Sequence, residues 1–105
     1  MQEKIKTFIR FSLASRKYLL GESCINKKAK LVLIANDASP RSKKMYEDKL
    51  SYLNIKFLEV CSKEELGSLL GKSEISAFGF TDSHMAQAIV KEIKEDENNG
   101  KKLKK

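Results

Sequence analysis

The sequence predicts an α/β protein, specifically a three-layer α/β/α sandwich with a small four-stranded mixed sheet. Two observations indicate this class. Amphipathic helical patterns alternate with short apolar runs along most of the 105 residues, which is the order expected when helices cover both faces of a sheet. Residues 31–35 (LVLIA) are apolar at every position, as expected of a strand buried on both faces. The length is that of a single domain with its own core.

The first third of the chain supplies one long helix and two strands. Residues 2–16 predict an amphipathic helix, because apolar side chains recur at helical spacing. This stripe is formed by Ile5, Phe8, Ile9 and Leu13. Residues 16–20 (RKYLL) predict a short edge strand, residues 22–28 leave room for one or two helical turns, and residues 30–35 form the central strand.

Polar residues after the central strand mark the start of a second long helix. Ser39 and Pro40 are an N-cap followed by proline at the first helical position. We expect this helix to run to about residue 53 and to end at Asn54. Residues 55–60 (IKFLEV) alternate between apolar and polar side chains, which predicts the next strand.

Two further helices and one strand complete the domain. Residues 62–70 begin with a capping box (SKEE) and predict a short helix that stops at the following glycine. Residues 75–80 (ISAFGF) predict the last strand, in which Gly79 indicates a bulge or the close approach of another group. Thr81 and Asp82 supply cap chemistry for a final helix.

The folded domain is expected to span residues 1–93. Residues 94–105 (KEDENNGKKLKK) contain a single apolar residue, which predicts a charged, disordered tail. No apolar run approaches the roughly 20 residues that cross a bilayer, and the N-terminus lacks a signal-peptide pattern, so we expect a cytoplasmic protein. Cys24 and Cys61 stand alone in the sequence, which favours reduced thiols over a zinc site or a disulfide framework.

Positive charge is concentrated in the first half of the chain. The net charge is +7, yet residues 1–58 carry 13 Lys or Arg against 5 Asp or Glu, whereas residues 59–97 carry 4 against 9. This asymmetry favours a polyanionic partner such as nucleic acid, because neutralising phosphates releases counterions and supplies affinity independent of sequence. A basic face that serves solubility alone is the alternative.

The enzyme class finds little support. Residues 67–73 (GSLLGKS) have three residues between their glycines where a phosphate-binding loop needs four, and two of these are leucines of the predicted helix. The single histidine, His84, falls at a helix start and is expected to be a surface or cap residue. We therefore predict a non-catalytic protein that needs no cofactor or metal.

Two groups of residues are candidates for nucleic-acid contact. Lys27, Lys28 and Lys30 cluster ahead of the central strand, where lysines would bind phosphates without reading sequence; a solvated basic surface is the alternative. Phe78 and Phe80 are two residues apart in a strand and point to the same face. Both favour core positions, although Phe80 at the strand end offers an apolar surface to an unstacked base.

Three segments carry a resemblance to a known family. Residues 28–40 (KAKLVLIANDASP) are similar to the pattern A-K-L-V-x-x-A-x-D-x-x-P, residues 62–71 (SKEELGSLLG) to S-K-E-E-L-G-x-x-x-G, and residues 77–86 (AFGFTDSHMA) to a last strand and turn. These patterns belong to the kink-turn RNA-binding ribosomal protein family (L-seven-Ae and L-thirty-e), and the chain most resembles its small bacterial YlxQ-like branch. The resemblance implies a three-layer α/β/α fold, no catalysis, and RNA binding at one end of the sheet.

The resemblance also implies which residues would bind RNA. Family members contact kink-turns through a G-x-N-E-x-x-K segment opening the second helix, the turn after the central strand, and the loop after the last strand. By position the first becomes residues 21–27, which carry Ser23 and Cys24 in place of Asn and Glu. The segment 21–29 that contains them is shorter than is usual in the family. The implied RNA-binding residues are Gly21, Glu22, Ser23, Lys27, Lys28, Lys30, Ser39, Phe78, Gly79, Phe80 and Thr81.

Charge and resemblance together predict a non-catalytic RNA-binding protein of ribosomal-protein type. The expected partner is a structured, kink-turn-like RNA, ribosomal RNA included, with no membrane partner and a monomer as the default oligomeric state. The alternative is a protein-interaction adaptor, because the growth-arrest branch of the superfamily keeps the fold and binds proteins. The short second helix and the acidic residues 59–97 motivate this alternative.

Overall fold

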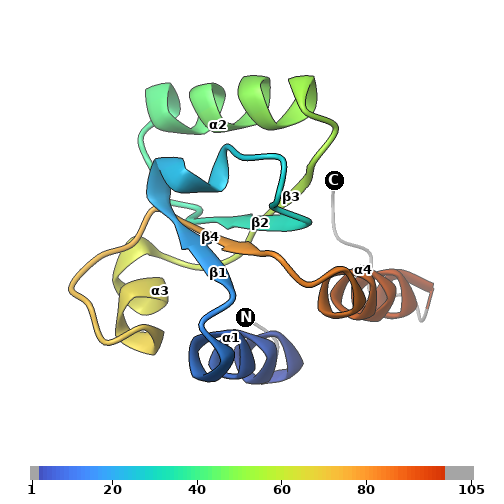
Figure 1. The fold of residues 1–105 in the computed structure, drawn as a ribbon. Helices are drawn as coiled ribbons and strands as arrows, with labels where there is room; N and C mark the ends of the chain where they lie inside the picture. The colour runs from blue at the N-terminus through green and yellow to red at the C-terminus, as the bar shows by residue number, and fades with distance from the viewer. Residues whose placement is uncertain (1–2, 99–105) are drawn as a thin grey trace.

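Four short strands form one mixed sheet in the order β1-β4-β2-β3 (Figure 1). The computed structural model describes residues 3–98. The two central strands, β2 (Leu31–Ile34) and β4 (Ala77–Phe80), are antiparallel to each other. The edge strand β1 (Tyr18–Leu20) is antiparallel to β4, whereas the other edge strand, β3 (Lys56–Glu59), is parallel to β2.

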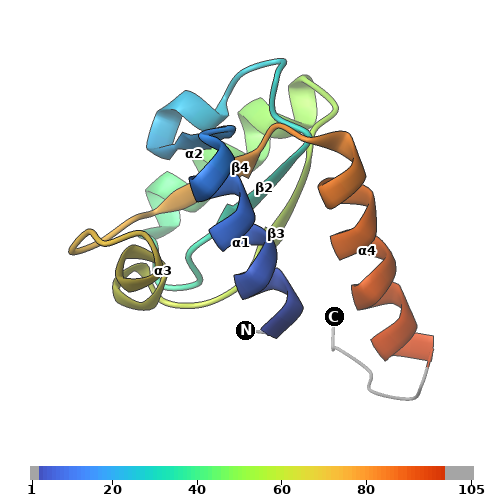
Figure 2. The same ribbon diagram turned by 60° about the horizontal axis from the view of Figure 1, so that its bottom comes forward.

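Helices cover both faces of this sheet, which confirms the predicted three-layer α/β/α arrangement. One face carries α2 (Pro40–Tyr52) and the 3-10 helix η1 (Gly21–Cys24), as Figure 1 shows. The other face carries α1 (Glu3–Ser15), α3 (Lys63–Leu69) and α4 (Ser83–Asn98). Figure 2, which brings this second face forward, shows α1 between α3 and α4.

Strand β2 separates two hydrophobic cores. Leu31 and Leu33 pack into the core that lies under α1, α3 and α4. Val32 and Ile34 point the other way and pack with Tyr46 and its neighbours under α2. Because alternate residues of a strand face opposite sides, a strand between two apolar layers must be apolar throughout, and all four β2 side chains are 0% exposed.

The predicted caps form where the sequence placed them. Ser39 accepts a hydrogen bond from the backbone N–H of Ser42 (3.1 Å), and Ser62 accepts one from Glu65 (3.0 Å). Asp82 caps α4 by accepting from the backbone N–H groups of residues 84 and 85 at 2.8 and 3.2 Å. Such bonds satisfy amide donors that the first helical turn leaves free.

The structure decides one length that the sequence left open and moves one predicted boundary. The segment after β1 forms a single 3-10 turn, Gly21–Cys24, the shorter of the two lengths considered. Helix α4 continues to Asn98, so the domain boundary expected at residue 93 falls inside a helix and residues 94–98 are helical. Lysine and glutamate dominate this stretch and have high helix propensity despite their polarity. The remainder of the expected tail, residues 99–105, lies outside the described residues.

Gly67 belongs to helix packing. It is buried inside α3, and a β-carbon built on it would lie 2.8 Å from the carbonyl oxygen of Ser73 and 2.9 Å from Cα of Glu74. Backbone atoms cannot move aside as a flexible side chain can. The glycine therefore lets the loop after α3 fold back against the helix, which explains the glycine-rich segment without a bound phosphate.

Replacing Gly67 by alanine is expected to destabilise the protein by about 1–3 kcal/mol through overpacking against this loop. At a helical position with open space around it, the same change would stabilise the protein by about 1 kcal/mol. The sign of the change in unfolding free energy therefore tells whether Gly67 is packed against the loop. Urea unfolding of Gly67→Ala measures the effect, with exposed Ser68→Ala in the same helix as control. A Gly67→Ala protein as stable as the parent would contradict the packing role.

The thiol of Cys24 should make stability fall at alkaline pH. Burial raises the pKa of Cys24 from 9.0 to about 12, and the thiol contacts the carbonyl oxygen of Leu19 at 3.4 Å as a donor. Above pH 9 the unfolded chain loses this proton while the folded one keeps it, so the stabilisation is complete below pH 9 and is lost as pH rises toward 12.

This dependence can be isolated by comparison with Cys24→Ala. Between pH 9 and 10 the unfolding free energy of the parent should fall relative to the variant by about 1 kcal/mol. Urea titrations at half-unit steps of pH measure both proteins. A difference between them that stays constant with pH would contradict the assignment.

Candidate nucleic-acid interface

Strand direction divides the predicted site residues between two ends of the sheet. Strands β1, β2 and β3 run in the same direction and β4 runs against them. At the carboxyl end, β1 leads into η1, β2 into the turn 35–39 and β3 into the turn 60–62, and β4 begins. At the amino end, β1, β2 and β3 begin and β4 leads into α4 (Figure 1). Ligand sites of α/β sheets form preferentially at the carboxyl ends of strands.

The carboxyl end brings together two of the predicted contact segments. Gly21, with a backbone φ of +55°, turns the chain from β1 into η1, and the next residues, Glu22 and Ser23, are exposed. Ser39 stands at the start of α2 and is also exposed. Its hydroxyl already serves the helix, because it accepts from Ser42 N–H and donates to the Ser42 hydroxyl at 3.1 Å.

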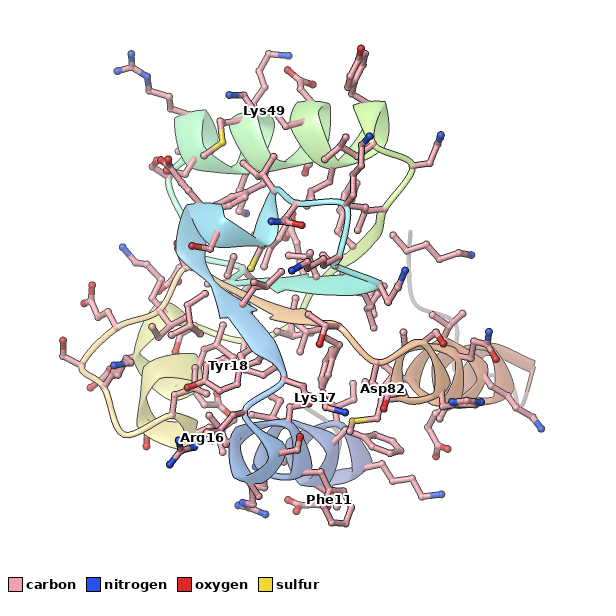
Figure 3. All side chains as sticks on the ribbon, in the orientation of Figure 1. Phe11, Arg16, Lys17, Tyr18, Lys49 and Asp82 are labelled. Carbon is pink, nitrogen blue, oxygen red and sulfur yellow. The ribbon has the colours of Figure 1, made fainter. Side chains whose placement is uncertain are left out.

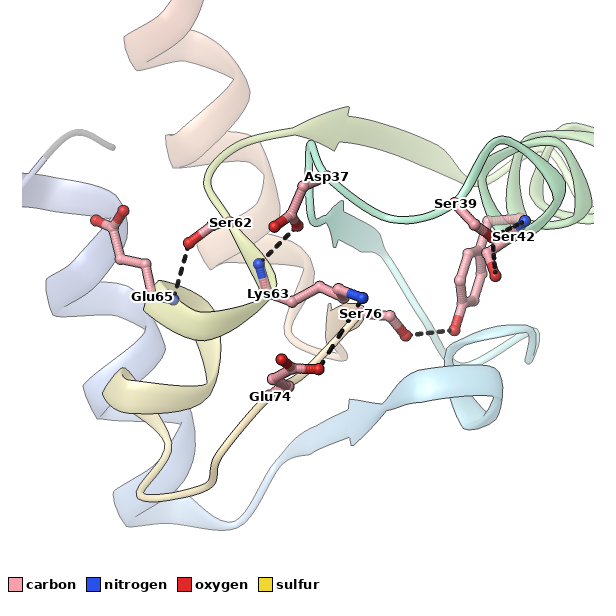
Figure 4. Close-up of polar contacts among 9 residues, drawn as sticks. Asp37, Ser39, Ser42, Ser62, Lys63, Glu65, Glu74 and Ser76 are labelled. Carbon is pink, nitrogen blue, oxygen red and sulfur yellow. Dashed lines mark hydrogen bonds and ion pairs between the residues drawn. The ribbon is translucent and has the colours of Figure 1, made fainter.

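Hydrogen bonds order this end of the sheet (Figure 4). The carboxylate of Asp37 accepts from the backbone N–H of Lys63 at 2.8 Å, which ties the turn after β2 to the start of α3. The Lys63 ammonium lies 3.9 Å from the carboxylate of Glu74. The Tyr46 hydroxyl of α2 is 3.0 Å from that of Ser76, just before β4. The loop 70–76 is thereby held at the same end as Ser39.

The sequence pattern of this loop was weighed only as a phosphate-binding loop and did not indicate a contact with RNA. Residues 71–74 are exposed and polar. They lie at the same end of the sheet as Ser39 because β4, which follows them, is antiparallel to β2 and begins at that end. A polar run between a helix and a strand is the one local signal that would have raised it as a candidate. Strand direction depends on pairing between distant segments, which the sequence pattern did not provide.

The predicted lysines lie at the opposite, amino end. Lys27, Lys28 and Lys30 are exposed in the connection from η1 to β2. Asn26 orders this connection, because its side-chain oxygen accepts from the backbone N–H of Lys28 at 2.8 Å. Thr81, half-buried, follows β4 at the same end. The structure thus gathers these four residues at the end of the sheet opposite to Gly21 and Ser39. Ser23 lies between the two ends, because its neighbour Cys24 packs over Gly79 of β4.

The prediction that residues 78–80 contact RNA is wrong for their side chains. Phe78 and Phe80 are both 0% exposed and pack edge to face with ring centroids 5.0 Å apart in the core under α1. Gly79 is buried and paired with Leu19 on one side and Val32 on the other. Because β4 is a central strand, Phe80 offers no surface to a base.

Gly79 is explained by the opposite face of the same strand. A β-carbon there would lie 3.2 Å from the sulfur of Cys24, so the glycine admits the 3-10 turn close to the sheet. Cys24 itself is 0% exposed. The position where the resembling family carries glutamate therefore points into the core, and the polar groups of η1 that reach solvent are those of Glu22 and Ser23.

Other chemistries find no grouped residues in the part of the chain that the structure describes. Among residues 3–92, whose side chains the structure describes, no cluster of three or more His, Cys, Asp or Glu is able to hold a metal ion. His84 is exposed on the first turn of α4, with its Nδ1 3.8 Å from Asp82. Within residues 3–98, no helix is long and apolar enough to cross a membrane.

Comparison with known proteins gives the family. A model of the ribosomal protein L7Ae/L30e/S12e/Gadd45 family matches residues 3–90. The chain belongs to this family. Two relatives named RNA-binding protein YlxQ place it in the YlxQ-like branch. The relative from Enterococcus faecium is 33% identical over 91 residues, 82% of this chain and 87% of the relative. That from Bacillus subtilis (strain 168) is 32% identical over 81 residues, 72% and 81% respectively.

A solved structure supports the fold of this family member. A protein of unknown function from Bacillus halodurans C superposes with a TM-score of 0.79, covering 89% of this chain and 99% of that one at 24% identity. At this identity the likeness concerns the α/β/α fold alone. The fold class expected from the sequence is therefore confirmed by an independent structure.

The bond between Asp37 and the start of α3 is expected to stabilise the carboxyl end. Asp37→Ala should lower the unfolding free energy by about 1–2 kcal/mol, because it leaves the amide of Lys63 without its charge-assisted partner. Asp37→Asn retains a side-chain oxygen and should lose less than half as much. Urea unfolding compares the two, and equal losses in both variants would argue against this hydrogen bond as the cause.

Proposed function

We propose that this protein is a non-catalytic RNA-binding protein of ribosomal-protein type that recognises a structured, kink-turn-like RNA. The observation that carries the proposal is the meeting of two family contact segments, residues 21–23 and the turn before Ser39, at the carboxyl end of the sheet. Family membership, the names of the two relatives and the net charge of +7 support it.

The carboxyl end suits contacts with base edges. Ser23 is exposed on η1 and its hydroxyl both donates and accepts hydrogen bonds. In the first turn of α2, the backbone N–H of Arg41 is left for a ligand, because Pro40 has none and those of Ser42 and Lys43 bond to Ser39; such a group binds anionic or carbonyl oxygens. Structured RNA is read in this way where its bases are unpaired or unstacked and their edges are accessible.

The lysines supply the electrostatic part of binding. Lys27, Lys28 and Lys30 are exposed, and phosphate contacts from lysine position an RNA without reading its sequence. With about four phosphate contacts in all, the logarithm of the binding constant should fall with the logarithm of salt concentration with a slope of about −3. Thr81 lies beside these lysines and is suited to hydrogen bonding with the same backbone.

A protein-interaction adaptor is the second candidate function. The observation in its favour is η1, which has a single turn and buries Cys24 where the family carries glutamate. An adaptor would retain its partners from cell extract after nuclease treatment, whereas an RNA-binding protein would lose partners that are bridged by RNA.

The proposal predicts a preference for bent RNA that depends on Ser23. The parent should bind a kink-turn RNA more tightly than a straight duplex of equal length, measured by fluorescence anisotropy across a salt series. Ser23→Ala should weaken kink-turn binding about fivefold, corresponding to about 1 kcal/mol for one hydrogen bond, and leave duplex binding unchanged. Exposed Ser51→Ala on α2 is the matched control. Equal affinity of the parent for both RNAs would overturn the proposal.

A further inference from the structure

The amino end of the sheet carries five exposed lysines from three separate chain segments. One precedes β1, three lie between η1 and β2, and one opens β3. They are Lys17, Lys27, Lys28, Lys30 and Lys56. Lys27, Lys28 and Lys30 are a cluster in the sequence itself, and the fold brings Lys17 and Lys56 to the same end of the sheet.

Strand register brings these segments side by side. Tyr18 and Leu31 both pair with Phe80, on opposite sides of β4. Lys17 and Lys30 directly precede these two residues, so they flank the end of β4, and the backbone N–H of Lys30 bonds to the carbonyl oxygen of Phe80 at 2.7 Å. Leu31 also pairs with Lys56. At about 4.8 Å between strands, the lysines span about 14 Å.

In the part of the chain that the structure describes, the carboxyl end carries both paired and unpaired basic side chains, the latter including Arg41 and Lys72, whereas the amino-end lysines are all unpaired. Near the carboxyl end, Lys43 and Lys63 each lie beside a glutamate, at 3.4 and 3.9 Å. Among the described residues, none of the five amino-end lysines lies within 4.0 Å of a carboxylate oxygen. Along the chain, Glu22 lies between Lys17 and Lys27, and Glu59 follows Lys56 at the other end of β3. Asp82, which follows β4 near Lys17 (Figure 3), caps α4.

Unpaired lysines on a rigid sheet end are suited to a polyanion. A nucleic-acid duplex carries on the order of one charge per 2 Å of axis, so a span of about 14 Å faces several phosphates. Strands of four residues separate the two ends by roughly 13 Å at about 3.3 Å per residue. Nucleotides held at the carboxyl end therefore cannot themselves occupy the amino end.

We propose that the amino end is a second RNA-contact surface, which binds the phosphate backbone of a helical arm extending from the segment read at the carboxyl end. The inference rests on the proposed function and assigns RNA binding to two surfaces. The carboxyl end discriminates between RNA structures, and Lys17, Lys30 and Lys56 supply affinity that grows with the length of the arm.

The test uses the full chain with Lys17→Gln, Lys30→Gln and Lys56→Gln combined. The control combines Lys4→Gln, Lys44→Gln and Lys91→Gln, which removes the same charge from exposed positions on α1, α2 and α4. Kink-turn RNAs with a short or a long arm, and a straight duplex, are titrated across a salt series. Circular dichroism verifies that both variants are folded.

The amino-end variant should lose on the order of tenfold in affinity for the long-arm RNA, and its salt slope should be smaller by about 2. With RNAs that have short arms, the amino-end variant should prefer the kink-turn over the duplex by the same affinity ratio as the parent protein. An amino-end variant indistinguishable from the control would overturn the inference. A parent protein that binds kink-turn and duplex RNA equally well would overturn the proposed function instead. In that case, a smaller salt slope of the amino-end variant than of the control variant would still show whether the amino end binds RNA.

Discussion

The burial of β2 on both faces is the constraint on which the rest of this structure depends. Leu31 and Leu33 serve one core and Val32 and Ile34 the other, and burying such side chains contributes roughly 2 kcal/mol each. A strand enclosed in this way has no face left for polar groups. The sheet can therefore offer functional side chains only where its strands end, at two opposite ends.

These two surfaces are built differently. The carboxyl end is ordered by hydrogen bonds that link successive connections, such as that from Lys63 N–H to Asp37 and that between Tyr46 and Ser76. The amino end is formed by lysines with long, mobile side chains on backbone fixed by the sheet ladder. Ordered polar groups can distinguish the shapes of ligands, whereas mobile ammonium groups attract phosphate wherever it lies. The fold is thus suited to separating selectivity from affinity.

Local features of the fold could be predicted from the sequence, and non-local ones could not. The caps at Ser39 and Ser62 depend on a few neighbouring residues, and each formed as expected. The spacing of Phe78 and Phe80 favoured the core positions that both occupy. The pairing of β1 with β4 across some 60 residues of chain, which leaves Phe80 no surface for a base, is encoded by no short pattern. The same pairing determines which loops share an end of the sheet, so the candidate site was predicted as one surface and is divided into two.

The contact between Gly79 and Cys24 has a consequence for the evolution of this branch of the family. The turn that presents Ser23 rests on the bare backbone of β4, with Cys24 filling the space that a side chain at position 79 would occupy. The two positions therefore form a single steric unit. A larger residue at position 79 would be accommodated by a smaller residue at position 24 or by a shift of the turn away from the sheet.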